Sequence, residues 1–281
     1  MVEMIRKEVE KAMNAEVVVN KVTKNNGIEL TGLSVRAEGL NISPVVYIDS
    51  YVEALENKEL TINEVVEKII ATYEANKVTN NFDVNQLASC KVRARLINKA
   101  ENMDLLEGLV YENFLDLAII YSFEVESLTD SECQASVKIT NQLLSALELS
   151  LEDIKSRMIE DIKVQTMFEA LTNMVDISEV DKSMLDDSPM IIITNSNNLF
   201  GAVNLTNTAV LETMANKLED DLFILPSSIH ELIVIPASIG QVDYLRNMVE
   251  MINQSEAAMD ERLSNNVYKY VRGSKAVTIA E

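Results

Sequence analysis

The residues around the only histidine of the chain carry its most direct candidate chemistry. Ser227, Ser228, His230 and Glu231 lie in one short segment. A serine hydroxyl beside a histidine that a carboxylate orients is the arrangement of a nucleophilic hydrolase. However, the chain has no G-x-S-x-G motif, and an extended segment would place Ser228 and His230 on one face and Glu231 on the other. We therefore keep these four residues as catalytic candidates, but we expect a structural corner in which the hydroxyls bond backbone amides.

A second candidate is a row of basic residues in a segment that alternates with apolar ones. Lys91, Arg93 and Arg95 recur at every second position, and this period of two predicts a strand with a basic face. Guanidinium and ammonium groups in a row are suited to binding an anion. The alternative is that the three side chains face solvent or pair with acids across the sheet.

Metal and cofactor chemistry has little support in the sequence. The pair His230-Glu231 lacks the second histidine of an H-E-x-x-H zinc motif. The two glycine-rich phosphate-binding motifs, G-x-x-x-x-G-K-[ST] and G-x-G-x-x-G, are also absent from the sequence. Asp186-Asp187 and Asp220-Asp221 are pairs that would suit a hard cation, but neither has the spacing of a calcium loop. We therefore expect no metal and no cofactor, and predict that the purified protein carries no stoichiometric transition metal.

The chain has two cysteines, Cys90 and Cys133, which are too few for a disulfide framework. They are typical of buried thiols in a reducing compartment. Either thiol would be a nucleophile if His230 lay beside it, but only Lys91 next to Cys90 favours a lowered thiol pKa.

The overall charge restricts the partners that we expect. The net charge is −21, whereas contacts to nucleic-acid phosphates require clustered lysine and arginine. The same repulsion acts at anionic membrane surfaces, and no apolar run is long enough to span a bilayer. We expect a soluble cytoplasmic protein with no direct nucleic-acid or membrane contact. A mimic of nucleic acid is the alternative explanation of the acidity.

The hydropathy pattern predicts an α+β fold with antiparallel or mixed sheets covered by helices, divided at residues 1–80, 81–175 and 176–281. In the first segment, Asn26-Gly27 predicts a hairpin turn and Thr61 with Glu64 predicts a helix capping box. In the second segment, strands are expected at Lys91–Asn98, Leu115–Val125 and Ala135–Thr140. A long helix from Ser150 should then bury Leu151, Ile154, Met158 and Ile162.

The last segment has the clearest pattern and predicts a ββαββα unit. A strand at Met190–Thr194 should return at Phe200–Leu205 after a hairpin turn, and the later strands should flank the Pro-Ser-Ser corner. The remaining elements are helices at Thr208–Leu218 and Gln241–Met259 and strands at Leu222–Leu225 and Glu231–Ile235.

The string Leu225–Glu231, with the sequence LPSSIHE, resembles a signature of an uncharacterised family of bacterial proteins. Thr194-Asn195 and Gly201-Ala202 precede it, and the segments Met248–Asn253 and Leu263–Tyr270 follow it in the same pattern. The resemblance covers most of the chain, and it implies no mechanism because the family has no established activity.

These observations favour a non-enzymatic binding or interaction protein with an unknown protein partner. The favoured alternative is a small hydrolase or transferase that uses the corner of Ser228 and His230. A nucleic-acid mimic is a third hypothesis. Whether the protein is an enzyme is left open by the sequence.

Overall fold

The computed structural model describes residues 1–78, 81–125, 135–167, 169 and 189–281. Three sheets of three, four and six strands follow one another along the chain, and every pairing between their named strands is antiparallel. Helices cover these sheets, so the predicted α+β class is confirmed.

The first sheet is built from residues near the amino end. Its strands are β1 (Val17–Thr23), β2 (Glu29–Val35) and β3 (Val45–Tyr47), and its helices are α1 (Val2–Met13), α2 (Asp49–Glu56) and α3 (Ile62–Asn76). Ile5 of α1, Leu33 of β2 and Ile69 of α3 share one buried core. The predicted capping box is present, since the Thr61 side chain accepts from the Glu64 backbone amide and the Glu64 carboxylate accepts from the Thr61 amide.

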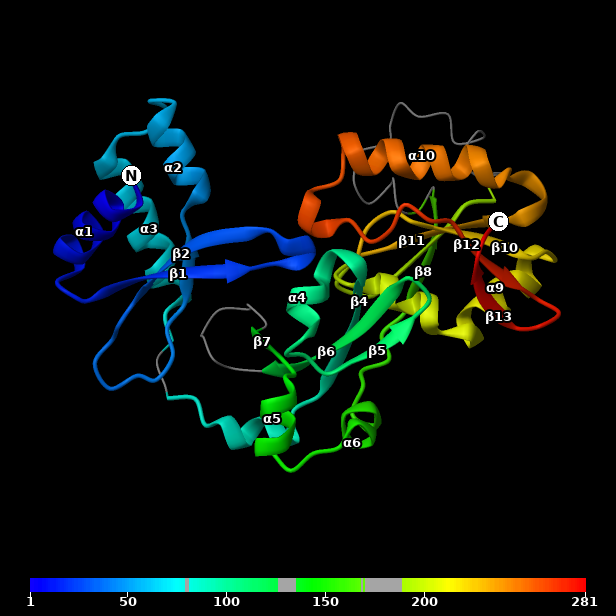
Figure 1. Ribbon diagram of the computed structural model, residues 1–281, viewed down its shortest axis with the longest axis horizontal. Coiled ribbons are helices and arrows are strands. Elements are labelled where there is room, and N and C mark those ends of the chain that lie inside the picture. Colours follow the sequence, from blue (N-terminus) through cyan, green and yellow to red (C-terminus); the bar gives the residue numbers. More distant parts are fainter. Residues whose placement is uncertain (79–80, 126–134, 168, 170–188) are drawn as a thin grey trace.

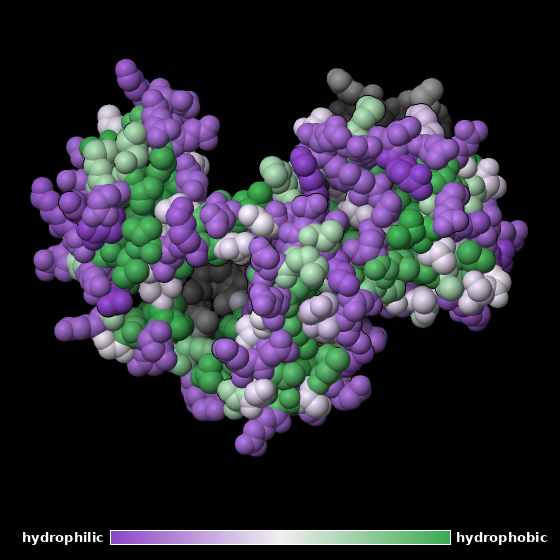
Figure 2. All heavy atoms as spheres, viewed as in Figure 1, coloured by the Kyte–Doolittle hydropathy of each residue, from purple (hydrophilic) through white to green (hydrophobic). Residues whose placement is uncertain are grey.

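The β1–β2 hairpin extends from the first sheet towards the rest of the molecule (Figure 1). Its turn, Asn25–Gly27, has positive φ at Asn26 (56°) and at Gly27 (70°). The predicted hairpin and the reason for it are therefore confirmed. The first sheet and its helices otherwise stand apart from the carboxyl-terminal part, and a hollow opens between them above the hairpin (Figure 2).

The middle sheet is centred on β6 (Leu117–Val125), which pairs with β4 (Val92–Asn98), β5 (Tyr111–Phe114) and β7 (Ala135–Lys138). The helices of this part are short: α4 (Met103–Leu106), α5 (Asn141–Ala146) and α6 (Leu151–Ser156). The predicted long helix from Ser150 is wrong beyond Ser156. The backbone leaves the helix there because the Arg157 carbonyl accepts from the Val92 amide at 3.0 Å.

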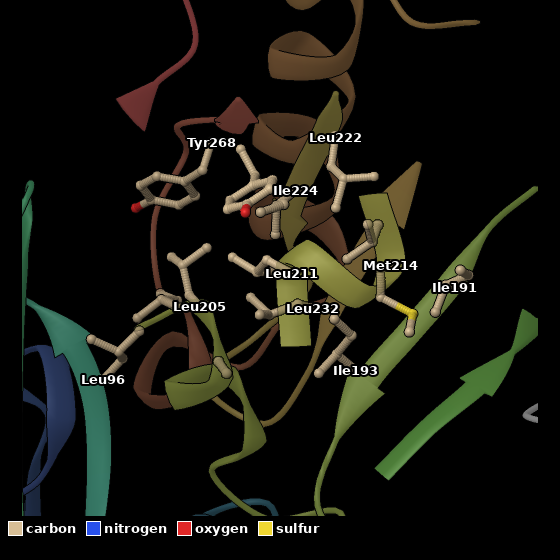
Figure 3. Packing of buried hydrophobic residues seen from close by; sticks show 14 of the residues in the cluster. Leu96, Ile191, Ile193, Leu205, Leu211, Met214, Leu222, Ile224, Leu232 and Tyr268 are labelled. Atoms are coloured by element: carbon tan, nitrogen blue, oxygen red, sulfur yellow. The ribbon is translucent and has the colours of Figure 1, made fainter. Parts of the chain in front are cut away.

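The third sheet has the strand order β13-β12-β10-β11-β9-β8. Helix α9 (Thr208–Leu218) covers one face, and α10 (Val242–Ser255) covers the other. Leu96 of β4 packs into the α9-side core, so this core joins the middle sheet to the third (Figure 3). The strands are β8 (Lys163–Thr166), β9 (Ile191–Thr194), β10 (Leu222–Pro226), β11 (Leu232–Pro236), β12 (Tyr268–Val271) and β13 (Ala276–Ile279).

One predicted strand of the last segment is replaced by a tight helix. Gly201–Thr206 forms a 3₁₀ helix, η4, instead of a strand returning beside β9, so no β-hairpin forms across Asn195–Gly201. Phe200 has a φ of 61°, which interrupts an extended chain, and a Cβ on Gly201 would lie 2.5 Å from Thr194 Cα. The backbone therefore turns back closely over the end of β9, and only glycine fits there.

The other elements of this segment agree with the prediction, except that α10 ends at Ser255 and that β12 and β13 add a hairpin. β8 lies before residue 176, in the predicted middle segment, yet it pairs with β9 of the third sheet. The three predicted domain boundaries remain a prediction. None of the helices described is long and apolar enough to cross a membrane.

Candidate ligand-binding cavity

A cavity of about 480 Å³ lies where all three sheets approach one another. The β1–β2 hairpin forms one wall with residues from Val22 to Asn25, and the middle sheet forms the floor. The loops around Phe200, His230 and Glu261 close the third side. Pockets of this volume hold small organic molecules in other proteins. The residues of the floor and of helix α4 are Arg95, Ile97, Leu105, Ile120, Ser136 and Lys138.

The strand register places the basic side chains on this floor. Residues directly opposite in an antiparallel pair share a face, and Arg95 lies opposite Ile120 while Arg93 lies opposite Ser122. Ser122 of β6 also lies opposite Lys138 of β7, which pairs with the other edge of β6. Arg93, Arg95 and Lys138 therefore project from one face of the sheet, with Arg95 and Lys138 lining the cavity.

Arg95 is held by two contacts at the cavity. Its Nη2 donates to the Ser136 hydroxyl at 2.9 Å, and its guanidinium carbon lies 3.9 Å from the centroid of the Phe200 ring. Its Nε is buried and has no acceptor among the described residues. Burial lowers the pKa of Arg95, and the neighbouring Arg93 adds to this while Glu124 opposes it.

Lys138 and Lys24 add two further positive charges. Burial lowers the pKa of Lys138, and repulsion from Arg95 and Lys24 lowers it further. The Lys24 ammonium lies 4.3 Å from the centroid of the Tyr47 ring. In the part of the chain that the structure describes, no carboxylate forms an ion pair with Lys24, Arg95 or Lys138.

The predicted basic row divides into residues with different surroundings. Arg93 lies 3.3 Å from the Glu124 carboxylate and 3.8 Å from that of Asp161, so its charge is balanced by acids. Lys91 is exposed and lies outside the cavity lining. Of the three residues, Arg95 alone lines the cavity.

His230 lines the cavity from the loop before β11 and is held in place by its neighbours. Its Nδ1 accepts from the Phe200 backbone amide at 3.1 Å, and its Nε2 lies 3.5 Å from a Glu261 carboxylate oxygen. An unprotonated Nδ1 is required to accept that bond, which assigns the hydrogen of the neutral ring to Nε2. The imidazole is thus a structural support for the loop that carries Phe200.

The serines of the corner bond to groups other than the imidazole. The Ser228 hydroxyl accepts from the His230 backbone amide at 2.9 Å, and the Ser227 hydroxyl donates to the Glu231 carboxylate at 3.3 Å. The structure therefore brings His230 beside Glu261 and Phe200, and it places Glu231 with Ser227.

Of the remaining candidates, Cys90, Asp220 and Asp221 lie outside the cavity lining. The Cys90 thiol lies 3.5 Å from the Gln86 carbonyl, and Cys133 falls outside the described residues, as does Asp186-Asp187. Asp220 accepts from the Ser238 amide, and Asp221 pairs with Lys269 at 3.2 Å. No group of three or more potential metal-binding side chains occurs within the described ranges.

Sequence reasoning missed Lys24, Lys138 and Phe200 as members of this site. Lys138 follows the same alternating pattern as Arg93 and Arg95, in a segment already predicted as a strand, and this pattern was the available signal. Lys24 and Phe200 reach the cavity through tertiary packing, for which a single sequence carries no local signal.

The architecture defines an α+β protein in which the β1–β2 hairpin, the middle sheet and loops of the third segment enclose a cavity that contains three cationic side chains. The chain belongs to a family of unknown function, DUF5688, whose model matches residues 1–272. No curated protein and no solved structure matches the chain at a significant level.

Proposed function

We propose that this chain is a non-enzymatic binding protein that holds an anionic ligand in the cavity between its sheets. One observation carries the proposal: Lys24, Arg95 and Lys138 line one cavity and, among the described residues, form no ion pair with an acid. In a chain with a net charge of −21, acids are abundant, and the two that line the same cavity, Asp260 and Glu261, form no ion pair with these three cations among the described residues. The three cations are partly buried, and clustered cations that lose part of their hydration disfavour folding unless a counter-charge binds to them.

The surroundings of the cations favour binding over catalysis. The Ser228 hydroxyl bonds the backbone of its own corner, and the His230 ring faces Phe200 and Glu261. A hydrolase at this corner requires a hydroxyl within hydrogen-bond reach of the imidazole. A protein partner remains compatible with the proposal if that partner supplies the anionic group.

Ligand-dependent thermal unfolding tests the proposal. A ligand that binds only the folded state raises its stability by RT ln(1 + [L]/Kd), so an anion that binds should raise the unfolding temperature with increasing concentration. Phosphate, acetate and octanoate should be compared with sodium chloride at one ionic strength, to separate specific binding from screening. The proposal fails if none of the three anions stabilises the wild-type chain more than chloride does.

A variant test locates the binding. Lys24→Met, Arg95→Met and Lys138→Met should each reduce the stabilisation by the bound anion. Lys21→Met is the matched control, because the Lys21 ammonium donates to the Thr31 hydroxyl at 2.9 Å and lies outside the cavity lining. Equal stabilisation in the cavity variants and the control would place the anion elsewhere.

A further inference from the structure

The cavity floor changes character along its strands. Arg95 and Ser136 share a hydrogen bond at the end of the floor where Lys138 lies. Two positions along β4 from Arg95, Ile97 lies on the same face and opposite Ala118. The floor therefore has a charged end at Arg95 and an apolar end at Ile97, two residues further along β4.

The apolar end is covered by side chains from two further elements. Leu105 of α4 lines the cavity beside Ile97 and Ile120, and Ile229 lines it from the loop before His230. Ile97 and Ile120 are each 4% exposed and belong to one small hydrophobic cluster with Leu106 of the same helix. Such a wall has no hydrogen-bonding group for the hydrated shell of a bare inorganic anion.

Two acids restrict the charge that the ligand can carry. Asp260 and Glu261, which follow α10 in the chain, also line the cavity. They would repel the additional charges of a polyphosphate or a nucleic-acid strand. The arrangement therefore suits one anionic group that is directed towards the floor.

We infer that the ligand is an amphipathic anion, with one carboxylate or phosphate head group on an apolar body. This inference rests on the proposed function and specifies its ligand class. The head group lies between Arg95 and Lys138, where charge-assisted hydrogen bonds are available. The body lies against Ile97, Leu105 and Ile229, where burial of each methylene contributes about 0.8 kcal/mol, or roughly fourfold in affinity.

Calorimetric titration of the whole chain with four probes tests the inference. Octanoate and octyl phosphate have both parts, octanol has only the body, and inorganic phosphate has only the head group. We expect both amphipathic anions to bind at least about tenfold more tightly than octanol, because the charged hydrogen bonds are lost with the alcohol. We expect inorganic phosphate to bind at least about a hundredfold more weakly than octyl phosphate, because several methylenes are then missing.

Variants assign the two ends of the ligand. Arg95→Met and Lys138→Met should each weaken octanoate about tenfold and leave octanol unchanged. Leu105→Gln should weaken octanoate and octanol alike, and Lys21→Met should change neither. Thermal unfolding of each variant without ligand verifies folding, and Lys138→Met serves the test if Arg95→Met does not fold.

The outcomes separate the inference from the proposed function. Inorganic phosphate binding as tightly as octyl phosphate would overturn the amphipathic ligand and leave anion binding intact. Octanol binding as tightly as octanoate would overturn both. Octanoate binding that is equally strong in Arg95→Met, Lys138→Met and Lys21→Met would also overturn the inference, because the head group would lie elsewhere.

Discussion

The guanidinium carbon of Arg95 lies 3.9 Å from the centroid of the Phe200 ring, on the cavity side of the middle sheet. This contact joins β4 to the loop that precedes η4. The centroid of the His230 ring lies 5.2 Å from the centroid of the same phenyl ring. Arg95, Phe200 and His230 thus form one connected group, in which the histidine holds the Phe200 backbone and the phenyl ring supports the arginine.

A double-mutant cycle measures the Arg95–Phe200 contact. Arg95→Met, Phe200→Leu and the double variant should give a coupling energy of about 0.5–2 kcal/mol, the range for a cation over an aromatic face. Denaturant unfolding supplies the four free energies. Arg93→Met in place of Arg95→Met is the control and should couple weakly to Phe200→Leu, because Arg93 pairs with Glu124 and Asp161. Additive effects of Arg95→Met and Phe200→Leu would show that the stacking contributes nothing.

Lys138→Met should leave the unliganded chain as stable as wild type or more stable at neutral pH. Burial, with repulsion from Arg95 and Lys24, lowers the pKa of Lys138 below the ordinary lysine value of 10.5, so its charged form is disfavoured in the folded state. Between the folded and unfolded pKa values, the unfolded chain binds more protons, and the stability of the wild type rises with pH. The advantage of Lys138→Met should therefore shrink as the pH rises towards 10.5.

Denaturant unfolding of wild type and Lys138→Met at several alkaline pH values checks this dependence. Lys21→Met, outside the cavity, should show no such trend relative to wild type. A Lys138→Met variant that is less stable than wild type at neutral pH would contradict the burial of an unbalanced charge at this position.

Local sequence patterns predicted most of the fold because burial was periodic. Ile191–Thr194 and Leu222–Pro226 are short buried runs of strand-forming residues, and Thr208–Leu218 has an apolar face at helical spacing. The strand expected at Phe200–Leu205 failed because its conformation depends on the close approach of Gly201 to Thr194. That contact joins two segments and leaves no periodic signal.

The site was predictable only in part. The period of two placed Arg93 and Arg95 on one face correctly, but it did not show that Arg93 forms ion pairs with two acids whereas Arg95 forms none with the described residues. That difference arises from the register with β6 and from the position of Asp161, which follows α6. Sequence spacing gives the face of a strand, whereas pairing partners decide which charges are balanced.

His230→Ala should lower the stability by about 1–3 kcal/mol, since it leaves the Phe200 amide without its acceptor. His230→Asn should recover part of this loss, because the amide oxygen of asparagine occupies nearly the position of Nδ1. Thermal and denaturant unfolding of both variants measure the difference. Unchanged stability in His230→Ala, together with loss of a hydrolytic activity, would favour the catalytic alternative.

Tyr268 and Tyr270 offer a matched pair on one strand. Both are fully buried, but the Tyr268 hydroxyl donates to Asp116 at 2.9 Å, whereas the Tyr270 hydroxyl has no partner among the described residues. Tyr268→Phe should cost about 1.5–3 kcal/mol, the contribution of a hydrogen bond to a charged group. Tyr270→Phe should be neutral or stabilising, because it removes an unsatisfied buried hydroxyl.

Denaturant midpoints of the two single variants decide this prediction. The Asp116 carboxylate also accepts from the Ser264 hydroxyl at 2.8 Å and from the Asn266 amide at 3.0 Å, so it joins the middle sheet to the segment before β12. The burial of the ring and the proximity of Asp116 raise the pKa of Tyr268, which therefore stays protonated across the working pH range. Equal losses in the two variants would mean that the Asp116 hydrogen bond adds nothing.

Hydrogen bonds at the tip of the β1–β2 hairpin should hold the first sheet against the rest of the molecule. The Asn26 side-chain amide donates to the Met259 carbonyl at 2.7 Å and to the Arg262 carbonyl at 2.9 Å. Its oxygen accepts from the Asn102 amide at 2.9 Å. Asn26→Gly removes these three bonds while tolerating the φ of 56°, so the turn itself should persist.

Asn26→Gly should therefore free the hairpin from the loop at Met259–Arg262 without unfolding either sheet. We expect faster amide hydrogen exchange at the hairpin tip and near Asp260, and weaker octanoate binding, because Asn25 and Asp260 line the same cavity. Asn198→Gly is the control, since Asn198 is exposed, has a φ of 54° and lies outside the cavity lining. Exchange at the hairpin tip that is as slow in Asn26→Gly as in Asn198→Gly would show that other contacts hold the hairpin in place.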